Sequence, residues 1–425
     1  MMTYDPNDPQ HRSWVEAAED SDFPIQNLPF GVIETDAQGP RVAVPIGEKI
    51  VDLAKLDELG YLKDIDGLDP ATLRASNLNP LIALGKPVTR ALRKRLSHLL
   101  HADNGELRDS PRDHAALLLA REQVRPLLPV AIGDYVDFYS SLEHATNVGL
   151  LFRPDNPLPP NWKHLPIGYH GRTSTIVVGE TPIRRPRGQT RAADGSITFG
   201  PSGKLDYELE VGFVVGRDSE MGSVISVSQA EEYIFGLVLV NDWSARDIQA
   251  WEYQPLGPFL GKSFGTSISP WVVTQEALEP FRVEGAPQDP PAPPYLHAPG
   301  ARNYDLHLEV SVQPEGAMRA TTVCRTNFRY MYWSMCQQLA HLTSNGTALR
   351  VGGLCASGTV SGPEEGSFGS LLELTRNGAR PFRLEGGQTR TFLEDGDTVT
   401  MRGHGARNGL RIGFGGLSGS VRPPV

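Results

Sequence analysis

The sequence predicts a mainly β protein with some α-helix, divided into two domains. Short apolar runs alternate with Gly- and Pro-rich turns over most of the chain, which is typical of short strands. With 425 residues the chain is long enough for more than one domain, and Pro126 and Pro129 separate two differently organised parts. We therefore expect an N-terminal domain at residues 1–130 and a larger, mainly β domain at residues 131–425.

The N-terminal domain begins with strand-like runs and continues into helices. Three apolar runs broken by Gly and Pro, as in small β-barrels, cover residues 30–36, 41–47 and 49–53. Residues 88–100 have helical periodicity instead. One apolar stripe of this helix contains Val88, Leu92, Leu96 and Leu99.

Two further helices are predicted from their end signals. Ser110 as N-cap and Pro111 in the first turn predict a helix that extends to Val124. In the C-terminal domain the one clear helical pattern covers residues 330–344, where an Asn-Gly pair stops it. The proline-dense segment at residues 285–300 is expected to be an ordered surface loop.

Composition excludes several classes of function. The formal net charge of -10 argues against a nucleic-acid surface, and no apolar run approaches a membrane span. The first residues are polar and acidic, so we expect no signal peptide and a cytoplasmic location. Cys324, Cys336 and Cys355 lack metal-ligand spacing, which argues against zinc and favours free, buried thiols in a reducing compartment.

Four carboxylates stand in apolar surroundings. Glu208 and Glu210 are two apart in the apolar run 205–216, so in a strand they point to the same face. Asp242 ends another apolar run, and Asp137 precedes a polar segment. The pair could mark the solvated face of an amphipathic strand, or it could be buried and need a proton or a cation. A carboxylate site without Cys or His prefers Ca²⁺ or Mg²⁺, between which the sequence does not choose.

The segment after the last of these acids predicts a short helix with one polar face. Ser244 could cap it, with Asp247 at the third helical position. Arg246, Gln249 and Tyr253 then follow i, i+3, i+7 spacing. A face with a cation, an amide and a phenol can bind an oxyanion, although a solvated helix face would have the same pattern.

A lysine and a histidine complete the candidate chemistry. Lys262 lies in the Gly- and Pro-rich loop 257–265, which is one residue short of a phosphate-binding loop and obstructed by Pro, Phe and Leu, so nucleotide binding is excluded. His144 is the best candidate for a general base, and Glu373, an acid among apolar residues, could support its ring.

The chain closely resembles the fumarylacetoacetate hydrolase family. The matching stretches are DFYSSLEHATNVG, NWKHLPIGYHGR, LDYELE, NDWSARDIQAWEYQPLGPFLGKSFGTSISPW, MYWSMCQQLAHLTSNG and ASGTVSGPEEGSFGSLLEL. They span most of residues 130–425, and the long block that begins at Asn241 is highly specific. The resemblance implies a mixed β-sandwich roll for the C-terminal domain. The N-terminal domain resembles the family's SH3-like barrel more loosely.

The resemblance also implies roles for individual residues. It implies a Ca²⁺ site formed by Asp137, Glu208, Glu210 and Asp242, with Lys262 and Thr266 near a second, Mg²⁺ site. His144 and Glu373 would form a dyad that activates water. The implied substrate contacts are Tyr139, Arg153, Tyr169, Gln249, Tyr253 and Thr359. The residues implied around a developing oxyanion are Arg246, Gln249 and Lys262.

The reaction implied by the resemblance is hydrolysis of a carbon–carbon bond. The β-diketo acid fumarylacetoacetate would give fumarate and acetoacetate, the last step of tyrosine and phenylalanine degradation, in an enzyme expected to be a homodimer. The alternatives are a relative that hydrolyses, decarboxylates or hydrates another β-dicarbonyl acid, and an inactive metal-binding scaffold. His144 and Glu373 argue against a relative without water activation, and the complete set of motifs argues against a scaffold.

Overall fold

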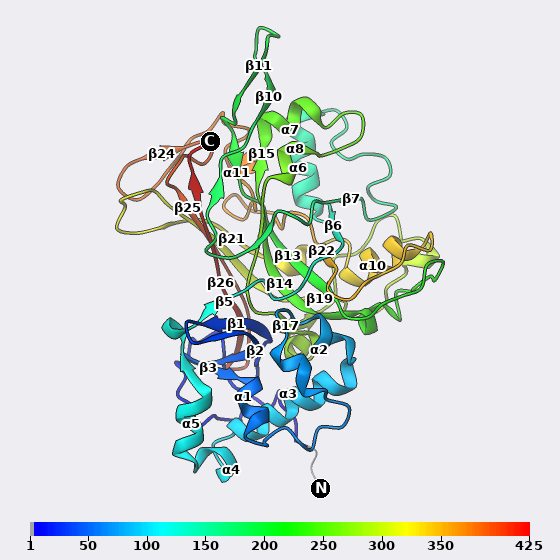
Figure 1. Cartoon of the computed structure of the whole chain (residues 1–425). Coiled ribbons are helices and arrows are strands. Elements are labelled where there is room, and N and C mark those ends of the chain that lie inside the picture. The colour runs from blue at the N-terminus through cyan, green and yellow to red at the C-terminus, as the bar shows by residue number, and fades with distance from the viewer. Residues whose placement is uncertain (1–3) are drawn as a thin grey trace.

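The computed structural model describes residues 4–425 and confirms a mainly β chain with some α-helix. Figure 1 shows a smaller N-terminal unit at one end of the molecule and the larger, strand-rich remainder above it. The apolar core of the N-terminal unit continues into the large unit, where it includes Tyr135, Val214, Val238 and Val240. The domain boundary at residue 130 stays a prediction.

The N-terminal unit contains one antiparallel sheet with strand order β4-β3-β2-β1-β5. All three predicted strand regions are confirmed. The strands are β1 (Gly31–Thr35), β2 (Gln38–Ile46), β3 (Lys49–Asp52), β4 (Leu118–Ala120) and β5 (Arg125–Pro126). The helices are α1 (Leu53–Glu58), α2 (Asn79–Ala83), α3 (Lys86–Leu100), α4 (Gly105–Arg108) and α5 (Pro111–Leu117).

One N-terminal helix is confirmed and the other is shorter than predicted. The apolar stripe of α3 is buried, as its periodicity predicts. Helix α5 ends at Leu117 instead of Val124, because the next three residues form β4 and pair with β3. Ser110 occupies the N-cap position, but its hydroxyl donates to the carboxylate of Asp113 at 2.8 Å and does not cap the backbone. Tertiary pairing therefore overrides the helical pattern here.

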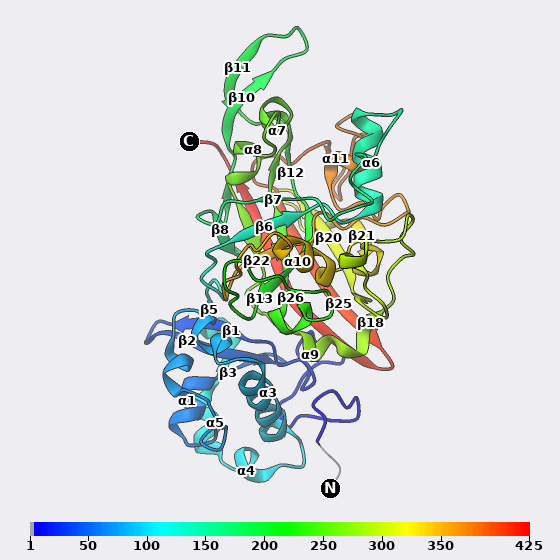
Figure 2. The ribbon, with the colours of Figure 1, turned by 90° about the vertical axis from the view of Figure 1, so that its right-hand side faces the viewer.

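The large unit contains two principal sheets. The first is mixed, with order β7-β6-β22-β13-β14-β16-β8 and β17 paired to β14. Its strands are β6 (Tyr135–Phe138), β7 (Gly168–His170), β8 (Ile176–Val178), β13 (Leu209–Val215), β14 (Ile234–Asp242), β16 (Thr266–Ile268), β17 (Val273–Thr274) and β22 (Leu354–Ala356). The second has order β21-β20-β25-β26-β9, with long β25 and β26 in Figure 2. Its strands are β9 (Ile183–Arg184), β20 (His307–Gln313), β21 (Thr321–Asn327), β25 (Thr398–Arg407) and β26 (Leu410–Arg422).

Short strand pairs and helices complete the large unit. The pairs are β10 (Arg187–Arg191) with β11 (Ile197–Pro201), β12 (Leu205–Asp206) with β15 (Ser244–Ala245), β18 (Arg282–Val283) with β19 (Asn303–Tyr304), and β23 (Phe382–Arg383) with β24 (Thr389–Arg390). The helices are α6 (Leu142–Phe152), α7 (Arg246–Glu252), α8 (Leu260–Ser263), α9 (Gln275–Leu278), α10 (Met335–Thr343) and α11 (Leu371–Leu374). Both ribbon views show α6, α7, α8 and α11 at the end of the molecule opposite the N-terminal unit.

The predicted helix at residues 330–344 begins later than expected. It is α10, which starts at Met335, because Phe328–Tyr330 form a separate 3₁₀ turn. Ser334 caps the helix, and its side chain forms a capping box with Gln337. The predicted stop is confirmed by Gly346, whose φ of 88° suits glycine.

Three other expectations can be compared with the structure. Residues 285–300 form a surface loop anchored by buried Leu296, as predicted. Cys324, Cys336 and Cys355 are all free and buried, as predicted. In the described part of the chain, we find no helix with the length and apolar character needed to cross a membrane.

Strand alternation places the acids on one face of the mixed sheet. Glu210 and Val214 are an even number of residues apart in β13, so their side chains point to the same face. The same holds for Asp242, Val238 and Val240 in β14. These valines belong to the core shared with the N-terminal unit. The acids therefore lie on that same face, at the strand ends where the apolar core gives way to polar residues.

Candidate active site

Four buried carboxylates meet at the end of the mixed sheet. One oxygen from each of Asp137, Glu208, Glu210 and Asp242 lies within 4.8 Å of the others. Asp137 comes from β6, Glu210 from β13 and Asp242 from the end of β14, whereas Glu208 directly precedes β13. Glu208 is 6% exposed and Glu210 is 0% exposed, so the solvated-face interpretation of this pair is wrong.

The donor atoms of this acidic group fit a hard cation. Burial and the neighbouring acids raise the pKa of both Asp137 and Glu210 well above the usual range. Asp137 Oδ1 and Glu210 Oε1 have no hydrogen-bond partner within residues 4–425, while Glu210 Oε2 accepts from the Gly358 amide at 3.0 Å. Unpaired buried carboxylate oxygens are costly, and a divalent ion with oxygen ligands would relieve both effects. The group can therefore bind a metal ion.

Lys262 reaches this group from helix α8. Its Nζ donates to Asp242 Oδ2 at 2.6 Å and also to Glu208. Burial would lower the pKa of Lys262, but the charges of Asp242 and Glu208 outweigh it and raise the pKa above the usual value. Thr266 donates to Asp242 Oδ1 at 3.3 Å, and the Tyr169 hydroxyl donates to Asp242 Oδ2 at 2.9 Å. Lys262 thus balances part of the negative charge.

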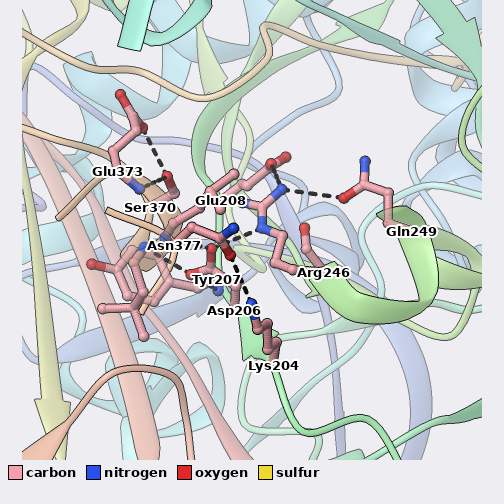
Figure 3. Close-up of polar contacts among 12 residues, drawn as sticks. Lys204, Asp206, Tyr207, Glu208, Arg246, Gln249, Ser370, Glu373 and Asn377 are labelled. Carbon is pink, nitrogen blue, oxygen red and sulfur yellow. Dashed lines mark hydrogen bonds and ion pairs between the residues drawn. The ribbon is translucent and has the colours of Figure 1, made fainter. Parts of the chain in front are cut away.

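Arg246, the first residue of α7, lies beside Glu208 in Figure 3 and binds the carboxylate oxygen that Lys262 does not. Its Nε donates to Asp206 Oδ2 at 2.8 Å, and its Nη1 pairs with Glu208 Oε1 at 2.7 Å and reaches Gln249 Oε1 at 3.4 Å. Burial would raise the pKa of Glu208, but the charges of Lys262 and Arg246 lower it well below the usual range. Arg246 Nη2 is buried and has no protein partner in the described chain. One donor therefore stays free for a ligand.

The predicted cap and polar face of α7 are only partly correct. Ser244 pairs in β15 instead of capping the helix, and Ala245 occupies the N-cap position without a side-chain hydrogen bond. Asp247 accepts from the Ser202 hydroxyl at 2.6 Å, which ties the helix start to the preceding loop. Tyr253 is 42% exposed at the C-cap of the helix, whereas Arg246 is buried at its start.

A histidine–carboxylate pair lies beside the acidic group. His144 Nδ1 is 2.7 Å from Glu373 Oε2, and both side chains are buried. His144 comes from α6 and Glu373 from α11. A proton on His144 would lower the pKa of Glu208, so the pair and the acids form one electrostatically coupled site. This is the arrangement in which a carboxylate orients a histidine base.

Glu373 is held by several donors besides the histidine. It accepts from Asn147 at 2.9 Å, from Ser361 at 2.9 and 3.0 Å, and from Ser370 at 2.8 Å. Burial would raise the pKa of Glu373, but a proton on His144 and the hydrogen bonds with His144, Asn147 and Ser370 lower it instead. The Tyr139 ring lies edge-on to the His144 ring, with centroids 5.3 Å apart. The carboxylate is thus fixed in its ionised form.

The remaining predicted residues differ in their placement. Thr359 is buried, and its hydroxyl has no partner within the described residues. Arg153 is exposed at the end of α6 and donates to the Pro157 carbonyl at 3.2 Å, outside the hydrogen-bond network of the site. Burial raises the pKa of Tyr139 above the usual value, and the charge of Arg153 offsets only part of this rise. Arg153 and Tyr253 are therefore not joined to the buried network.

Several residues of this network are absent from the sequence-based prediction. Asp206 lies two residues before Glu208, so the same i, i+2 spacing that links Glu208 and Glu210 could have identified it. Ser370 and Glu373 have the S-x-x-E spacing of a capping box, and helix α6 has an N-cap signal in Ser141, which accepts from the His144 amide. No comparable sequence signal identifies Ser361.

Comparisons with known proteins agree with this architecture. The family "Fumarylacetoacetate (FAA) hydrolase C-terminal" matches residues 135–422, and "Fumarylacetoacetase N-terminal" matches residues 26–129. The solved structure described as fumarylacetoacetate hydrolase from psychrophilic Exiguobacterium antarcticum is similar in fold, with a TM-score of 0.54 and 17% identity. It covers 93% of this chain and 99% of that chain.

Curated relatives match almost from end to end. The chain is 50% identical over 420 residues to the fumarylacetoacetase of Caenorhabditis elegans, which covers 97% of this chain and 99% of the relative. It is 48% identical over 416 residues to the human fumarylacetoacetase, with coverage of 97% and 99%. Both family matches and this identity lead to one conclusion: the chain belongs to the fumarylacetoacetate hydrolase family.

Proposed function

We propose that this chain hydrolyses fumarylacetoacetate to fumarate and acetoacetate, the last step of tyrosine and phenylalanine degradation. The observation that carries the proposal is the buried His144–Glu373 pair next to a four-carboxylate group that can bind a metal. About half of the residues are identical to those of fumarylacetoacetases over nearly the full length, which supports the same substrate.

His144 acts as the base that makes water nucleophilic. Because Nδ1 faces Glu373, the second ring nitrogen, Nε2, is the atom that accepts the proton from water. Glu373 fixes the ring orientation and stabilises the imidazolium that forms. The activated water attacks the carbonyl carbon of the fumaryl group, and its oxygen ends in the new carboxylate of fumarate. Collapse of the oxyanion breaks the carbon–carbon bond to acetoacetate, and the proton that His144 took from water goes to the carbon of the departing enolate.

Arg246, Lys262 and Gln249 stabilise the oxyanion that forms at the attacked carbonyl. Arg246 offers its free Nη2, and its guanidinium is already fixed by Asp206 and Glu208. Lys262 is buried and held by Asp242, so its charge needs no reorganisation during the reaction. The Gln249 side chain can donate through its amide nitrogen while its oxygen faces Arg246.

The metal ligands are Asp137, Glu208, Glu210 and Asp242, which we assign to Ca²⁺. Lys262 and Thr266 would lie next to a second ion, Mg²⁺, beside Asp242. When bound, a divalent ion supplies Lewis-acid stabilisation for the enolate charge of the departing acetoacetate. The hard oxygen donors and the two unpartnered carboxylate oxygens support this assignment.

The substrate contacts are assigned to side chains around the pair and the acids: Tyr139, Arg153, Tyr169, Gln249, Tyr253 and Thr359. Thr359 has a buried hydroxyl without a protein partner, and Tyr169 reaches Asp242 directly. Arg153 and Tyr253 are exposed at the ends of α6 and α7, where they can bind the outer carboxylate of a diacid. A relative that decarboxylates another β-dicarbonyl acid would not need a water-activating pair.

The assignment extends to the organisation of the protein. We assign residues 1–130 to an SH3-like domain and residues 131–425 to the catalytic domain, in a cytoplasmic homodimer. The five-stranded N-terminal sheet supports the first assignment. Large apolar side chains on the surface support a partner subunit, among them Leu150, Phe152, Leu256, Phe259 and Leu260.

Metal removal tests the proposed site directly. The purified chain should remove the diketone absorbance of fumarylacetoacetate, and extensive treatment with a chelator should abolish this activity. Adding Ca²⁺ or Mg²⁺ should restore most of it, because the enolate charge of the departing acetoacetate has no Lewis-acid stabilisation without a bound ion. Activity that is indifferent to the chelator, with metal shown to be absent, would refute the metal role.

A further inference from the structure

We propose that Asp206 is a positioning residue that holds Arg246 and the Glu373 helix α11 in a fixed relation. This inference rests on the proposed function, since it assigns Arg246 to the oxyanion and Glu373 to the base. Asp206 is fully buried, and Figure 3 shows it between Arg246 and the segment with Ser370 and Glu373.

The carboxylate of Asp206 is saturated with donors. Oδ1 accepts from the amides of Tyr207 and Leu371, both at 2.8 Å. Oδ2 accepts from the Leu372 amide at 2.9 Å and from Arg246 Nε at 2.8 Å. One side chain therefore joins β12 to the starts of both α7 and α11.

Helix α11 depends on such contacts for its position. It contains four residues, far fewer than an isolated helix needs for stability in water. Its first two amides, of Leu371 and Leu372, bind Asp206, and the third, of Glu373, binds the Ser370 hydroxyl at 3.4 Å. The same hydroxyl donates to Glu373 Oε2 at 2.8 Å. Displacing the start of α11 would therefore displace the carboxylate that orients His144.

Arg246 depends on the same side chain for its orientation. Asp206 binds Nε and Glu208 binds Nη1, so two fixed acceptors define the guanidinium plane and leave Nη2 unpartnered. The backbone supports this arrangement, because β12 pairs with β15 and the Arg246 amide donates to the Lys204 carbonyl at 2.9 Å. Without Asp206 the guanidinium plane of Arg246 would be less fixed, and Nη2 would no longer point in one defined direction.

A second contact ties the same strand to α11. Lys204 Nζ donates to Asn377 Oδ1 at 3.0 Å, and the Asn377 amide donates to the Leu372 carbonyl at 2.8 Å. This link holds the Leu372 carbonyl of α11, whereas Asp206 binds the first two α11 amides and also the guanidinium of Arg246. Asp206 thus supports both the His144–Glu373 pair and the oxyanion donor Arg246.

Asp206→Asn tests the inference with little change in size. Asparagine has one acceptor oxygen, so about half of the contacts must be lost, including either the Arg246 contact or an α11 amide. We expect kcat to fall by about 10- to 100-fold while KM changes by less than about threefold, because misplacement of reacting groups acts mainly on turnover. The matched control is Asp52→Asn in the N-terminal unit. Asp52 is also buried and binds Arg41 at 3.1 Å and the Lys55 amide of α1 at 3.0 Å, so this variant should lower thermal stability and leave kcat unchanged.

Double-mutant cycles separate positioning from a purely structural role. Asp206→Asn should be combined once with Glu373→Gln and once with Arg246→Met. Asp206→Asn should lower kcat by at least about threefold less in the Glu373→Gln or Arg246→Met background than in wild type. Residues that act as a unit have effects that are not additive. Additive losses in either cycle, or an unchanged kcat in folded Asp206→Asn enzyme, would overturn the proposal.

A second variant and the wild-type activity separate the possible reasons for a negative result. If Asp206→Asn does not fold, Asp206→Glu keeps the charge but shifts the carboxylate by one methylene, and the same cycles apply. If the wild-type chain does not cleave fumarylacetoacetate, the proposed function fails. If wild type cleaves it and the cycles are additive, only the role of Asp206 fails.

Discussion

Replacing His144 with alanine is expected to lower kcat by about 10²- to 10⁴-fold, the range in which a positioned general base contributes to rate. The histidine is buried and its Nδ1 lies 2.7 Å from Glu373, which leaves Nε2 of the neutral ring to take the proton of an attacking water. Steady-state kinetics with fumarylacetoacetate measure this loss. Metal content and the thermal unfolding temperature should be measured on the same samples.

The fold should survive this substitution. Glu373 keeps its hydrogen bonds to Asn147, Ser361 and Ser370, so its carboxylate is not left unpaired. The control is His297→Ala, since His297 is exposed in the proline-dense loop, and this variant should keep full activity. A folded, metal-loaded His144→Ala enzyme with wild-type turnover would remove His144 from the mechanism.

The Glu373→Gln substitution is expected to have the second-largest effect, again through kcat and not through KM. Both carboxylate oxygens accept hydrogen bonds, whereas the amide nitrogen of glutamine can only donate. The new side chain must therefore turn its donor toward His144 or toward Asn147. Either choice loosens the ring of His144 or the fixed position of residue 373, and the negative charge that stabilises the imidazolium is lost.

The expected decrease in kcat for Glu373→Gln is about 10²- to 10⁴-fold, comparable with neutralising the acid of other histidine–carboxylate pairs. The matched control is Glu365→Gln, which neutralises an exposed acid in the preceding loop and should be nearly silent. Glu373 makes no proposed contact with substrate, so a loss confined to KM would argue for a binding role instead.

Local pattern was sufficient to predict much of the fold. The stripe of α3 follows a 3.6-residue period, and the strands β1 to β3 are bounded by Gly and Pro, so both signals are contained in neighbouring residues. The i, i+2 spacing of Glu208 and Glu210 likewise predicts a shared direction. Whether that direction led to solvent or to a buried site depended on distant strands, and the pattern alone favoured solvent, which is wrong for this pair.

Long-range pairing decided the rest. The end of α5 was overestimated because β3 recruits Leu118–Ala120 as a strand, and Ser244 does not cap α7 because β12 pairs with it. His144 and Glu373 are 229 residues apart in sequence, so no local pattern joins them. The apolar surroundings of Glu373 made it a candidate, and the family resemblance implied the pair. Asp206 was overlooked although it continues the same alternation, because its partners on α7 and α11 become neighbours only in the folded chain.

The central claim is that this chain cleaves the carbon–carbon bond of fumarylacetoacetate by attack of water. The most direct test is to run the reaction in water enriched in the heavy oxygen isotope and to identify the products by mass spectrometry. We expect equal amounts of fumarate and acetoacetate, with one labelled oxygen in the new carboxylate of fumarate. Release of carbon dioxide without fumarate, a hydrated product, or intact substrate with folded, metal-loaded protein would contradict the claim.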